Sequence, residues 1–390
     1  MQPRTTLKYD SLGLQKMQRK LQSIRECARE REVDATYARE FPDEIGLKLT
    51  NRCNLRCTHC FQWDIGGYHH SLDKSALKKE GDLRIEVVRE LFEKTKAQQS
   101  SLYLWGGEPT LYAHWDELIE LLKEDPRDTV MCTNAVNLQH QMESLISISE
   151  CLNILISIEG PEDIHDKIRG KNTYGKILEN LETLLARQQK GEYKGTISVE
   201  AVISDGLIPQ LYDFCEYYEK KGINSLFLNF PWFIPDHVAD EMDAFFAEKY
   251  HWMNTDRGKG NSWHSFDFKI SQEMIPELKV QIEKIMNKTW DIRIRFHPDL
   301  REDLVDYIEG ATKPAQRKTR CLGISNRIDL LPSGQVTPCK KFTEFIVGDL
   351  NNQSLEDVWN GPDYKRFREV HNNELMSICS KCEILYANGI

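Results

Sequence analysis

Short apolar stretches alternate with longer segments in which apolar residues recur every three or four positions. The first pattern predicts strands and the second predicts helices. We expect strands at 45–49, 101–105, 129–134, 153–158, 197–203 and 225–230, with a further strand at 292–296. We expect helices at 85–96, 138–149, 173–189, 208–221 and 272–287. Six strands separated by helical segments predict an α/β fold with a parallel, helix-covered sheet, in the order of a partial (β/α)6 TIM-like barrel.

Three parts of the chain do not follow this alternation. Residues 1–42 predict an N-terminal helical extension that packs on the barrel or binds a partner, because their apolar positions have helical spacing. Those positions are Leu14, Met17, Leu21 and Ile24. Residues 62–82 are polar and contain glycines, which predicts a lid. Residues 231–290 are rich in aromatic residues and prolines, and we interpret them as an insertion that either walls a substrate pocket or fills the open side of the barrel.

Composition and charge narrow the class of protein. The chain has 390 residues, of which 40% are hydrophobic, and a formal net charge of -10, which argues against an extended basic surface for nucleic acid. Its longest apolar runs, such as 152–156, are too short to span a bilayer, so we expect no membrane partner. Residues 1–20 lack the apolar core of a signal peptide, which predicts a cytoplasmic protein with reduced thiols. Eleven cysteines in that compartment favour metal binding over disulfides.

Cys53, Cys57 and Cys60 follow the first predicted strand with the spacing C-x3-C-x2-C. Three thiolates on one loop can hold three irons of a cubane cluster and leave the fourth iron open to bind and activate a ligand. A structural zinc site is an alternative, but it needs a fourth ligand, and His59 is too cramped between Cys57 and Cys60 to close the same tetrahedron. Three ordinary buried cysteines are the remaining alternative.

Polar residues also stand where the next predicted strands end. Gly106, Gly107 and Glu108 follow the second strand, where the glycines let backbone approach a ligand and the carboxylate can accept hydrogen bonds from an ammonium group. A plain tight turn is the alternative. Further polar residues end the third and fourth strands: Thr133, Asn134, Ser157 and Glu159.

The last seventy residues contain a second group of cysteines. Cys321 and Cys339 flank a predicted hairpin, and Cys379 and Cys382 form a C-x2-C pair near the end. Between them, Ser354 has the position of a helix N-cap. Four cysteines in two pairs predict a closed metal site, for which zinc and an iron–sulfur cluster are both possible.

In this order the motifs resemble those of the radical SAM superfamily. Its signature is the same cysteine triplet followed by an aromatic residue, here Phe61, and a Gly-Gly-Glu motif after the second strand. The C-terminal cysteines resemble the SPASM auxiliary-cluster domain, most closely its short twitch form with one cluster, because no cysteine follows Cys382. The resemblance covers nearly the whole chain from about residue 45.

The resemblance implies a 4Fe-4S cluster on the cysteine triplet, with S-adenosylmethionine (SAM) chelating the open iron. It implies that SAM contacts come from Phe61, Gly106, Gly107, Glu108, Thr133, Asn134, Ser157, Glu159 and Arg169. Arg169 would face the SAM carboxylate; a surface salt bridge with Asp166 is the alternative for this arginine. A second 4Fe-4S cluster would be held by the four C-terminal cysteines and would carry electrons.

These implications predict an enzyme that cleaves SAM reductively to a 5'-deoxyadenosyl radical and abstracts hydrogen from a substrate C–H bond. Our first hypothesis is an oxidoreductase that tailors a small polar natural product. The alternatives are a maturase that crosslinks or epimerises a ribosomal peptide, and a non-catalytic zinc or iron–sulfur scaffold. We expect a reductant such as flavodoxin or ferredoxin as a partner. The predicted parts are an extension at 1–42, a barrel at 43–310 and a cluster domain at 311–390.

Overall fold

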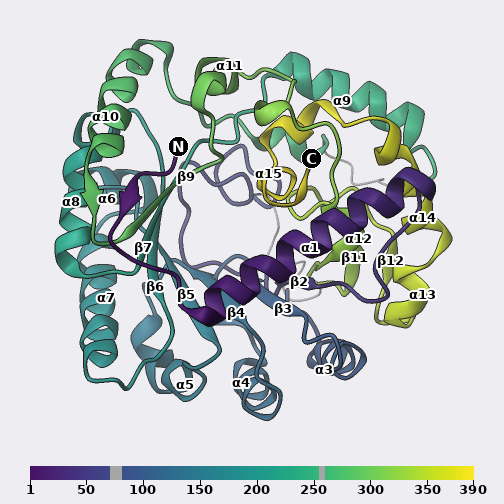
Figure 1. Ribbon diagram of the computed structural model, residues 1–390, viewed down its shortest axis with the longest axis horizontal. Coiled ribbons are helices and arrows are strands. Elements are labelled where there is room, and N and C mark those ends of the chain that lie inside the picture. Colours follow the sequence, from purple (N-terminus) through teal and green to yellow (C-terminus); the bar gives the residue numbers. More distant parts are fainter. Residues whose placement is uncertain (71–80, 254–259) are drawn as a thin grey trace.

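The computed structural model describes residues 1–70, 81–253 and 260–390 (Figure 1). Within them, ten strands form one sheet in the order β12-β11-β10-β2-β3-β4-β5-β6-β7-β9. The strands from β2 through β7 and β9 pair in parallel with their neighbours. The expected partial barrel of parallel strands is therefore confirmed. The strands are β1 Arg4–Thr5, β2 Glu44–Lys48, β3 Ser101–Trp105, β4 Thr129–Thr133, β5 Leu152–Ser157, β6 Ile197–Val202, β7 Ser225–Asn229, β8 Thr289–Trp290, β9 Arg293–His297, β10 Arg327–Leu330, β11 Gln335–Thr337 and β12 Gly348–Asp349.

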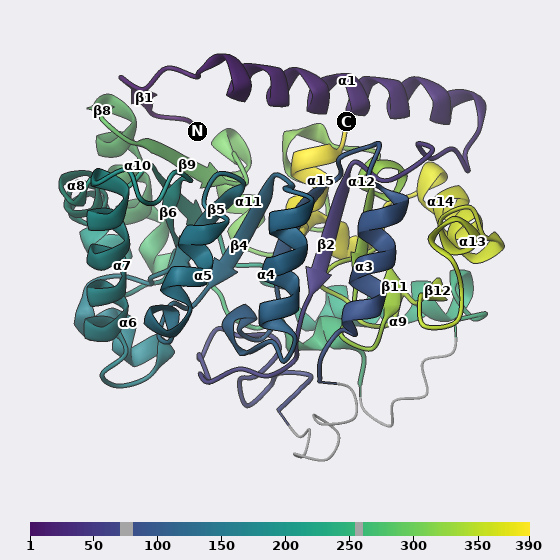
Figure 2. The ribbon, with the colours of Figure 1, turned by 90° about the horizontal axis from the view of Figure 1, so that it is seen from below.

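Helices cover the outer face of this sheet, as Figure 2 shows for α3, α4, α5 and α7. Each presents an apolar stripe to the strands; in α4, for example, Leu118 and Leu122 are fully buried. Helices α4 and α6 were not among the expected elements. The helices are α1 Ser11–Val33, α3 Ile85–Lys94, α4 Trp115–Glu124, α5 Met142–Ser147, α6 Glu162–Arg169, α7 Tyr174–Gln189, α8 Leu211–Lys221, α9 Asp236–Lys249, α10 Ile275–Asn287, α11 Leu304–Ile308, α12 Gly323–Asn326, α13 Leu355–Trp359, α14 Pro362–Asn373 and α15 Glu383–Asn388.

The C-terminal hairpin extends the barrel sheet at its first strand. Strand β10 pairs in parallel with β2, with Asp329 opposite Gly46. Arg327 forms buried ion pairs with Asp329 and Glu44. A side chain at Gly46 would collide with this network, since a Cβ there would lie 2.4 Å from the Arg327 guanidinium. The glycine therefore makes room for a charged pair that fixes the C-terminal hairpin against the barrel.

Helix α1 lies across the N-terminal ends of the barrel strands, and β2 runs away from it (Figure 2). The expectation that its apolar positions pack on the barrel is wrong: Leu14, Met17 and Leu21 are 42–47% exposed. The buried residues are instead Ser23, Cys27 and Arg31. Ser23 Oγ donates a hydrogen bond to Asp43 Oδ2 at 2.5 Å, and Arg31 reaches backbone carbonyls of the C-terminal segment.

The expected insertion contains more regular structure than its sequence suggests. Helix α9 buries Val238, Met242 and Phe246 on one face, although its pattern was expected to be irregular. Residues 254–259 of the insertion and 71–80 of the expected lid lie outside the described residues. None of the described helices is long and apolar enough to cross a membrane.

Candidate functional site

One cavity of about 460 Å³ runs through the inside of the barrel, a size common for ligand sites. All twelve residues expected at the SAM-binding cluster line this cavity. They are Cys53, Cys57, Cys60, Phe61, Gly106, Gly107, Glu108, Thr133, Asn134, Ser157, Glu159 and Arg169. They come from the ends of four consecutive strands, β2 to β5, and the connections that follow them, so the barrel topology brings together residues more than a hundred positions apart.

Gly106 and Gly107 pack against the backbone that enters the cysteine loop. A Cβ on Gly106 would lie 2.5 Å from the carbonyl oxygen of Thr50, and one on Gly107 would lie 2.1 Å from that of Arg52. The Gly107 N–H donates to the Thr50 carbonyl at 2.7 Å, and the Glu108 N–H donates to the Arg52 carbonyl at 2.8 Å. The close approach that the glycines allow is therefore an approach to protein backbone, and it positions the cysteine loop.

The cysteine triplet is embedded in the cavity wall. Burial raises the pKa of Cys53 to about 11 and that of Cys57 to about 12. It also raises the pKa of Cys60, whose thiol receives backbone N–H groups from Gln62 and Trp63. Thiolates at these positions need compensating positive charge, which bound iron would supply.

Glu108 is buried and holds the end of β4. Its Oε1 accepts hydrogen bonds from Thr110 and from Thr133 Oγ1, the latter at 2.7 Å, and its Oε2 accepts the Asn134 N–H at 2.8 Å. The Asn134 amide donates in turn to Asn54 Oδ1 in the cysteine loop at 2.8 Å. Burial raises the pKa of Glu108. All its donors are neutral, so its carboxylate has no cation among the described residues.

Glu159 and Arg169 form a buried ion pair beside the cysteines. Arg169 Nε donates to Glu159 Oε1 at 2.9 Å, and His59 Nε2 lies 2.9 Å from the same oxygen. Burial alone would raise the pKa of Glu159, but Arg169 and His59 together hold it well below its usual range. The alternative of a surface pair between Arg169 and Asp166 is wrong, because Asp166 instead accepts the backbone N–H groups that follow α6.

A further polar group fills the middle of the barrel. Glu200 Oε1 accepts hydrogen bonds from Cys132 Sγ at 2.9 Å and from Ser157 Oγ at 3.0 Å, and Asn229 Nδ2 lies 3.4 Å from Oε2. Cys132 and Asn229 were not among the residues expected at the site. Their alternation with core residues on β4 and β7 is the signal that would have found them.

Three charged residues of the C-terminal segment also reach the cavity. Lys340 Nζ lies 3.3 Å from Glu383, and Lys341 pairs with the same carboxylate. Lys340 also lies over the ring of Tyr103, 4.0 Å from its centroid. Lys340 and Lys341 follow Cys339, and Glu383 follows Cys382. Their positions next to the cysteines are the sequence signal that could have identified them.

The C-terminal cysteines gather outside the cavity wall. Each of Cys339 and Cys379 lies close enough to other members of the set for their charges to interact. Backbone N–H groups of Gly323 and Ile324 point at the Cys321 thiol, and that of Leu385 points at Cys382. Amide groups that donate to sulfur are typical of iron–sulfur ligands.

The distance between ligand atoms is one criterion for a preformed zinc site. Tetrahedral zinc with Zn–S bonds of about 2.3 Å draws its sulfurs to about 3.8 Å from one another. In the described parts of the chain, ligand atoms of three or more His, Cys, Asp or Glu side chains converge within 4.8 Å at Asp240, Asp243 and His264, and at neither cysteine set. Neither cysteine set is therefore preformed as a tetrahedral zinc site.

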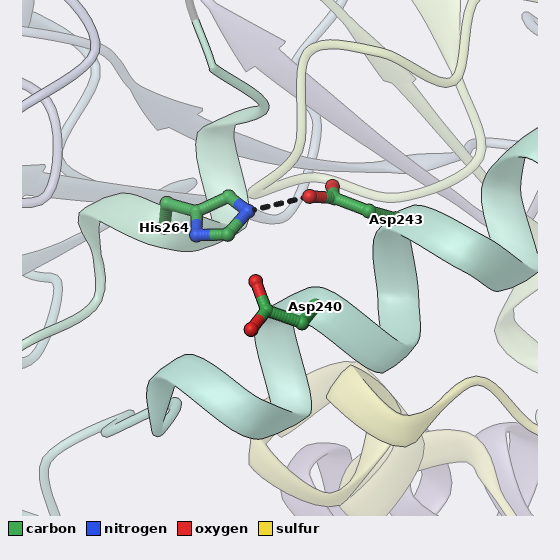
Figure 3. A group of neighbouring side chains, drawn as sticks. All are labelled: Asp240, Asp243 and His264. Carbon is green, nitrogen blue, oxygen red and sulfur yellow. Dashed lines mark hydrogen bonds and ion pairs between the residues drawn. The ribbon is translucent and has the colours of Figure 1, made fainter.

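The Asp240, Asp243 and His264 group lies on the surface of α9 and its neighbour segment (Figure 3). Asp243 is fully engaged: it accepts hydrogen bonds from Asn261 at 2.7 Å and from the Trp263 indole at 2.8 Å, and it pairs with His264 at 2.9 Å. These contacts account for the cluster as local structure that fixes α9.

Comparison with known proteins agrees with this geometry. A model of the radical SAM superfamily matches residues 47–215, and a model of the SPASM iron–sulfur cluster-binding domain matches residues 321–383. The protein is therefore a member of the radical SAM superfamily with a C-terminal SPASM domain. SAM and iron–sulfur clusters are accordingly its cofactors.

Two curated relatives and one solved structure illustrate the likeness. The mycofactocin maturase MftC of Mycobacterium ulcerans is 25% identical over 177 residues, which is 45% of this chain and 44% of that protein. The tungsten-containing aldehyde ferredoxin oxidoreductase cofactor-modifying protein of Pyrococcus furiosus is 22% identical, over 87% of this chain and 86% of its own. Streptococcus suis SuiB bound to its precursor peptide SuiA has the same fold, with a TM-score of 0.58 and 15% identity over 93% of this chain and 73% of that one.

Proposed function

We propose that Cys53, Cys57 and Cys60 hold the SAM-binding cluster and that the protein modifies a C–H bond of a polar substrate group inside the barrel. When bound, the cluster and SAM supply a 5'-deoxyadenosyl radical that abstracts hydrogen. The observation that carries the proposal is that all twelve candidate residues line one and the same cavity, together with charged groups of the C-terminal segment.

The chain's own residues would orient SAM by charge. The SAM ammonium suits Glu108, whose carboxylate has only neutral donors. The SAM carboxylate suits Arg169. This arginine pairs with Glu159 through Nε and Nη2, so its Nη1 remains to donate to SAM. The aromatic ring of Phe61 stacks on Phe266 with centroids 4.5 Å apart and closes the cavity on that side, which excludes water from the reacting atoms.

We propose an oxidative outcome, with Cys321, Cys339, Cys379 and Cys382 holding the auxiliary cluster. These four sulfurs leave no open position for substrate, and none of the four residues lines the cavity, whereas their neighbours Lys340 and Glu383 do. A fully ligated cluster one residue away from the cavity wall is suited to accept an electron from the substrate.

The first candidate substrate is a peptide, one side chain of which enters the barrel. It is supported by the maturase relative and by the structural neighbour with a bound precursor peptide. A small polar metabolite is the second candidate, supported by the cofactor-modifying relative, which aligns over most of both chains. In both cases we expect a cytoplasmic protein that receives electrons from flavodoxin or ferredoxin.

The test is anaerobic reconstitution followed by reaction with SAM and dithionite. We expect about eight irons per chain and formation of 5'-deoxyadenosine. Cys57→Ala should abolish that product, whereas Cys151→Ala, a cysteine outside the cavity, should leave it unchanged. Cys321→Ala should lower the iron content to about four. Product formation by Cys57→Ala would refute the proposed active site, and unchanged iron in Cys321→Ala would refute the auxiliary site.

A further inference from the structure

Two buried arginines lie near Cys321, one bonded to its backbone carbonyl and the other to that of Ile324. Arg31 of α1 and Arg368 of α14 are both 0% exposed. Arg31 Nη1 donates to the carbonyl of Cys321 at 2.7 Å, and its Nη2 donates to the carbonyl of Arg368 at 2.8 Å. Arg368 Nε donates to the carbonyl of Ile324 at 2.8 Å, and its guanidinium lies over the Tyr364 ring at 4.1 Å. Helix α1 thus brings a guanidinium to the backbone of a candidate cluster ligand.

Neither guanidinium has an acidic partner. No carboxylate of the described residues lies within 4.0 Å of either one, and Arg31 Nε and both terminal nitrogens of Arg368 lack hydrogen-bond acceptors. The carboxylate whose charge reaches Arg368 is that of Asp34, at the exposed end of α1. Burial lowers the pKa of each arginine to about 10, so both stay charged at neutral pH. Two unpaired buried cations are costly unless an anion nearby compensates them.

No carboxylate among the described side chains supplies this compensating anion, whereas the proposed cofactor is itself an anion. Four thiolates around an iron–sulfur core give a net negative charge, and one-electron reduction makes it more negative by one. Arg31 lies close enough to Cys321 to lower the pKa of that thiol against the effect of burial. A fixed cation stabilises the more negative of two redox states more strongly, which raises the reduction potential.

We propose that Arg31 and Arg368 are the built-in countercharge of the auxiliary cluster and raise its reduction potential, so that it accepts an electron more readily. The inference rests on the proposed assignment of the four cysteines. It also explains the unexpected orientation of α1. The helix turns Arg31 inward and leaves Leu14, Met17 and Leu21 outside because its buried end supplies charge to the cluster.

The experiment isolates the auxiliary cluster in the variant Cys53→Ala/Cys57→Ala/Cys60→Ala, reconstituted anaerobically. The midpoint potential is measured by redox titration monitored by electron paramagnetic resonance. Arg31→Gln removes the charge but keeps amide donors, and it should move the midpoint to more negative values by at least about 59 mV, a tenfold change in a one-electron equilibrium. Arg31→Lys keeps the charge and should stay near the parent. Arg29→Gln, an exposed arginine on the same helix paired with Glu30, is the matched control and should not shift.

Iron content decides between the possible failures. Full iron with an unmoved midpoint in Arg31→Gln overturns this inference alone, as does an equal shift in Arg31→Gln and Arg31→Lys, which would indicate geometry rather than charge. Loss of the cluster in Arg31→Gln but not in Arg31→Lys supports the inference, and Arg368→Gln and Arg368→Lys should repeat that difference. Loss of the cluster in both Arg31 variants overturns it. Absence of iron from the parent variant removes the cluster assignment and the inference with it.

Discussion

Replacement of Arg169 by methionine separates two roles that the structure gives this residue. Arg169 Nε donates to Glu159 at 2.9 Å, and its Nη2 donates to the same carboxylate, while Nη1 has no acceptor among the described residues and Arg169 lines the cavity. If Nη1 binds the SAM carboxylate, its loss removes a hydrogen bond between charged groups, worth about 1.5–3 kcal/mol. SAM binding should then weaken about 10- to 150-fold in Arg169→Met.

Glu159→Gln provides the discriminating comparison. It leaves the arginine in place and removes only the carboxylate charge that orients it, so SAM binding should weaken by less than about tenfold. The assay is SAM titration of anaerobically reconstituted protein, followed through the spectrum of the reduced cluster. Arg187→Met, a surface arginine paired with Glu143 and Glu192, is the control and should bind SAM normally. Equal weakening in Arg169→Met and Glu159→Gln would refute direct binding and leave Arg169 a purely structural role.

Stability gives an independent measure of the same pair. Glu159 is buried and also accepts the Val202 N–H at 2.7 Å, so Arg169→Met removes the guanidinium from a buried carboxylate and leaves the His59 imidazole beside it. Removal of one partner from a buried ion pair costs about 3–5 kcal/mol of unfolding free energy. The double variant Glu159→Gln/Arg169→Met should recover part of that loss in urea unfolding, because no unpaired charge remains. A double variant as unstable as the sum of the two single variants would contradict this account.

Two further predictions concern the cysteine loop and the response to acid. Gly107→Ala should reduce the iron bound by the triplet, because the new Cβ would lie 2.1 Å from the Arg52 carbonyl oxygen. The control is Gly175→Ala in α7, which has open space around it and should retain full iron. Equal iron in the two variants would contradict the steric argument. Burial lowers the pKa of His371 to about 3, so its contribution to stability is full above the unfolded pKa of about 6.5 and falls as pH drops toward 3. His371→Leu should therefore lose about 2 kcal/mol less unfolding free energy between pH 7 and pH 5 than the parent, and an unchanged pH dependence in urea unfolding would contradict a neutral buried histidine.

The barrel could be predicted from sequence because its strands are short and each carries buried apolar residues at alternate positions. In β5 and β6 the residues Ile154, Ile156, Ile197 and Val199 are buried, and this alternation marks a strand whatever it packs against. The buried face of helix α1 could not be predicted in the same way. Its apolar stripe has the right spacing, but the choice of buried face depends on partners near Cys321, about three hundred residues away. Helix α9 was missed because Phe245, beside the buried Phe246, blurs the contrast between its faces.

The candidate site likewise has features that the sequence predicts and contacts that only the fold reveals. The cysteines and the Gly-Gly-Glu motif could be found because their spacing is local and their chemistry is rare. The contacts that connect them could not: Asn134 reaches Asn54, and Glu159 reaches His59, only because neighbouring strands end at one edge of the sheet. The bonds of Glu200 to Cys132 and Asn229 likewise depend on the register of three strands.

The pairing of β10 with β2 joins the segments that carry the two cysteine sets into one sheet. Strand β2 leads into the loop of Cys53, and β10 follows Cys321, and the two strands are neighbours in parallel register. The buried Arg327 clamps both strands through Glu44 and Asp329. Because a packed sheet deforms little, the separation of the two cysteine sets is fixed by the fold rather than by a hinge. In the proposed oxidative reaction, the distance between the two clusters would therefore be constant, and the potential of the auxiliary cluster would be the quantity that the surrounding charges can still adjust.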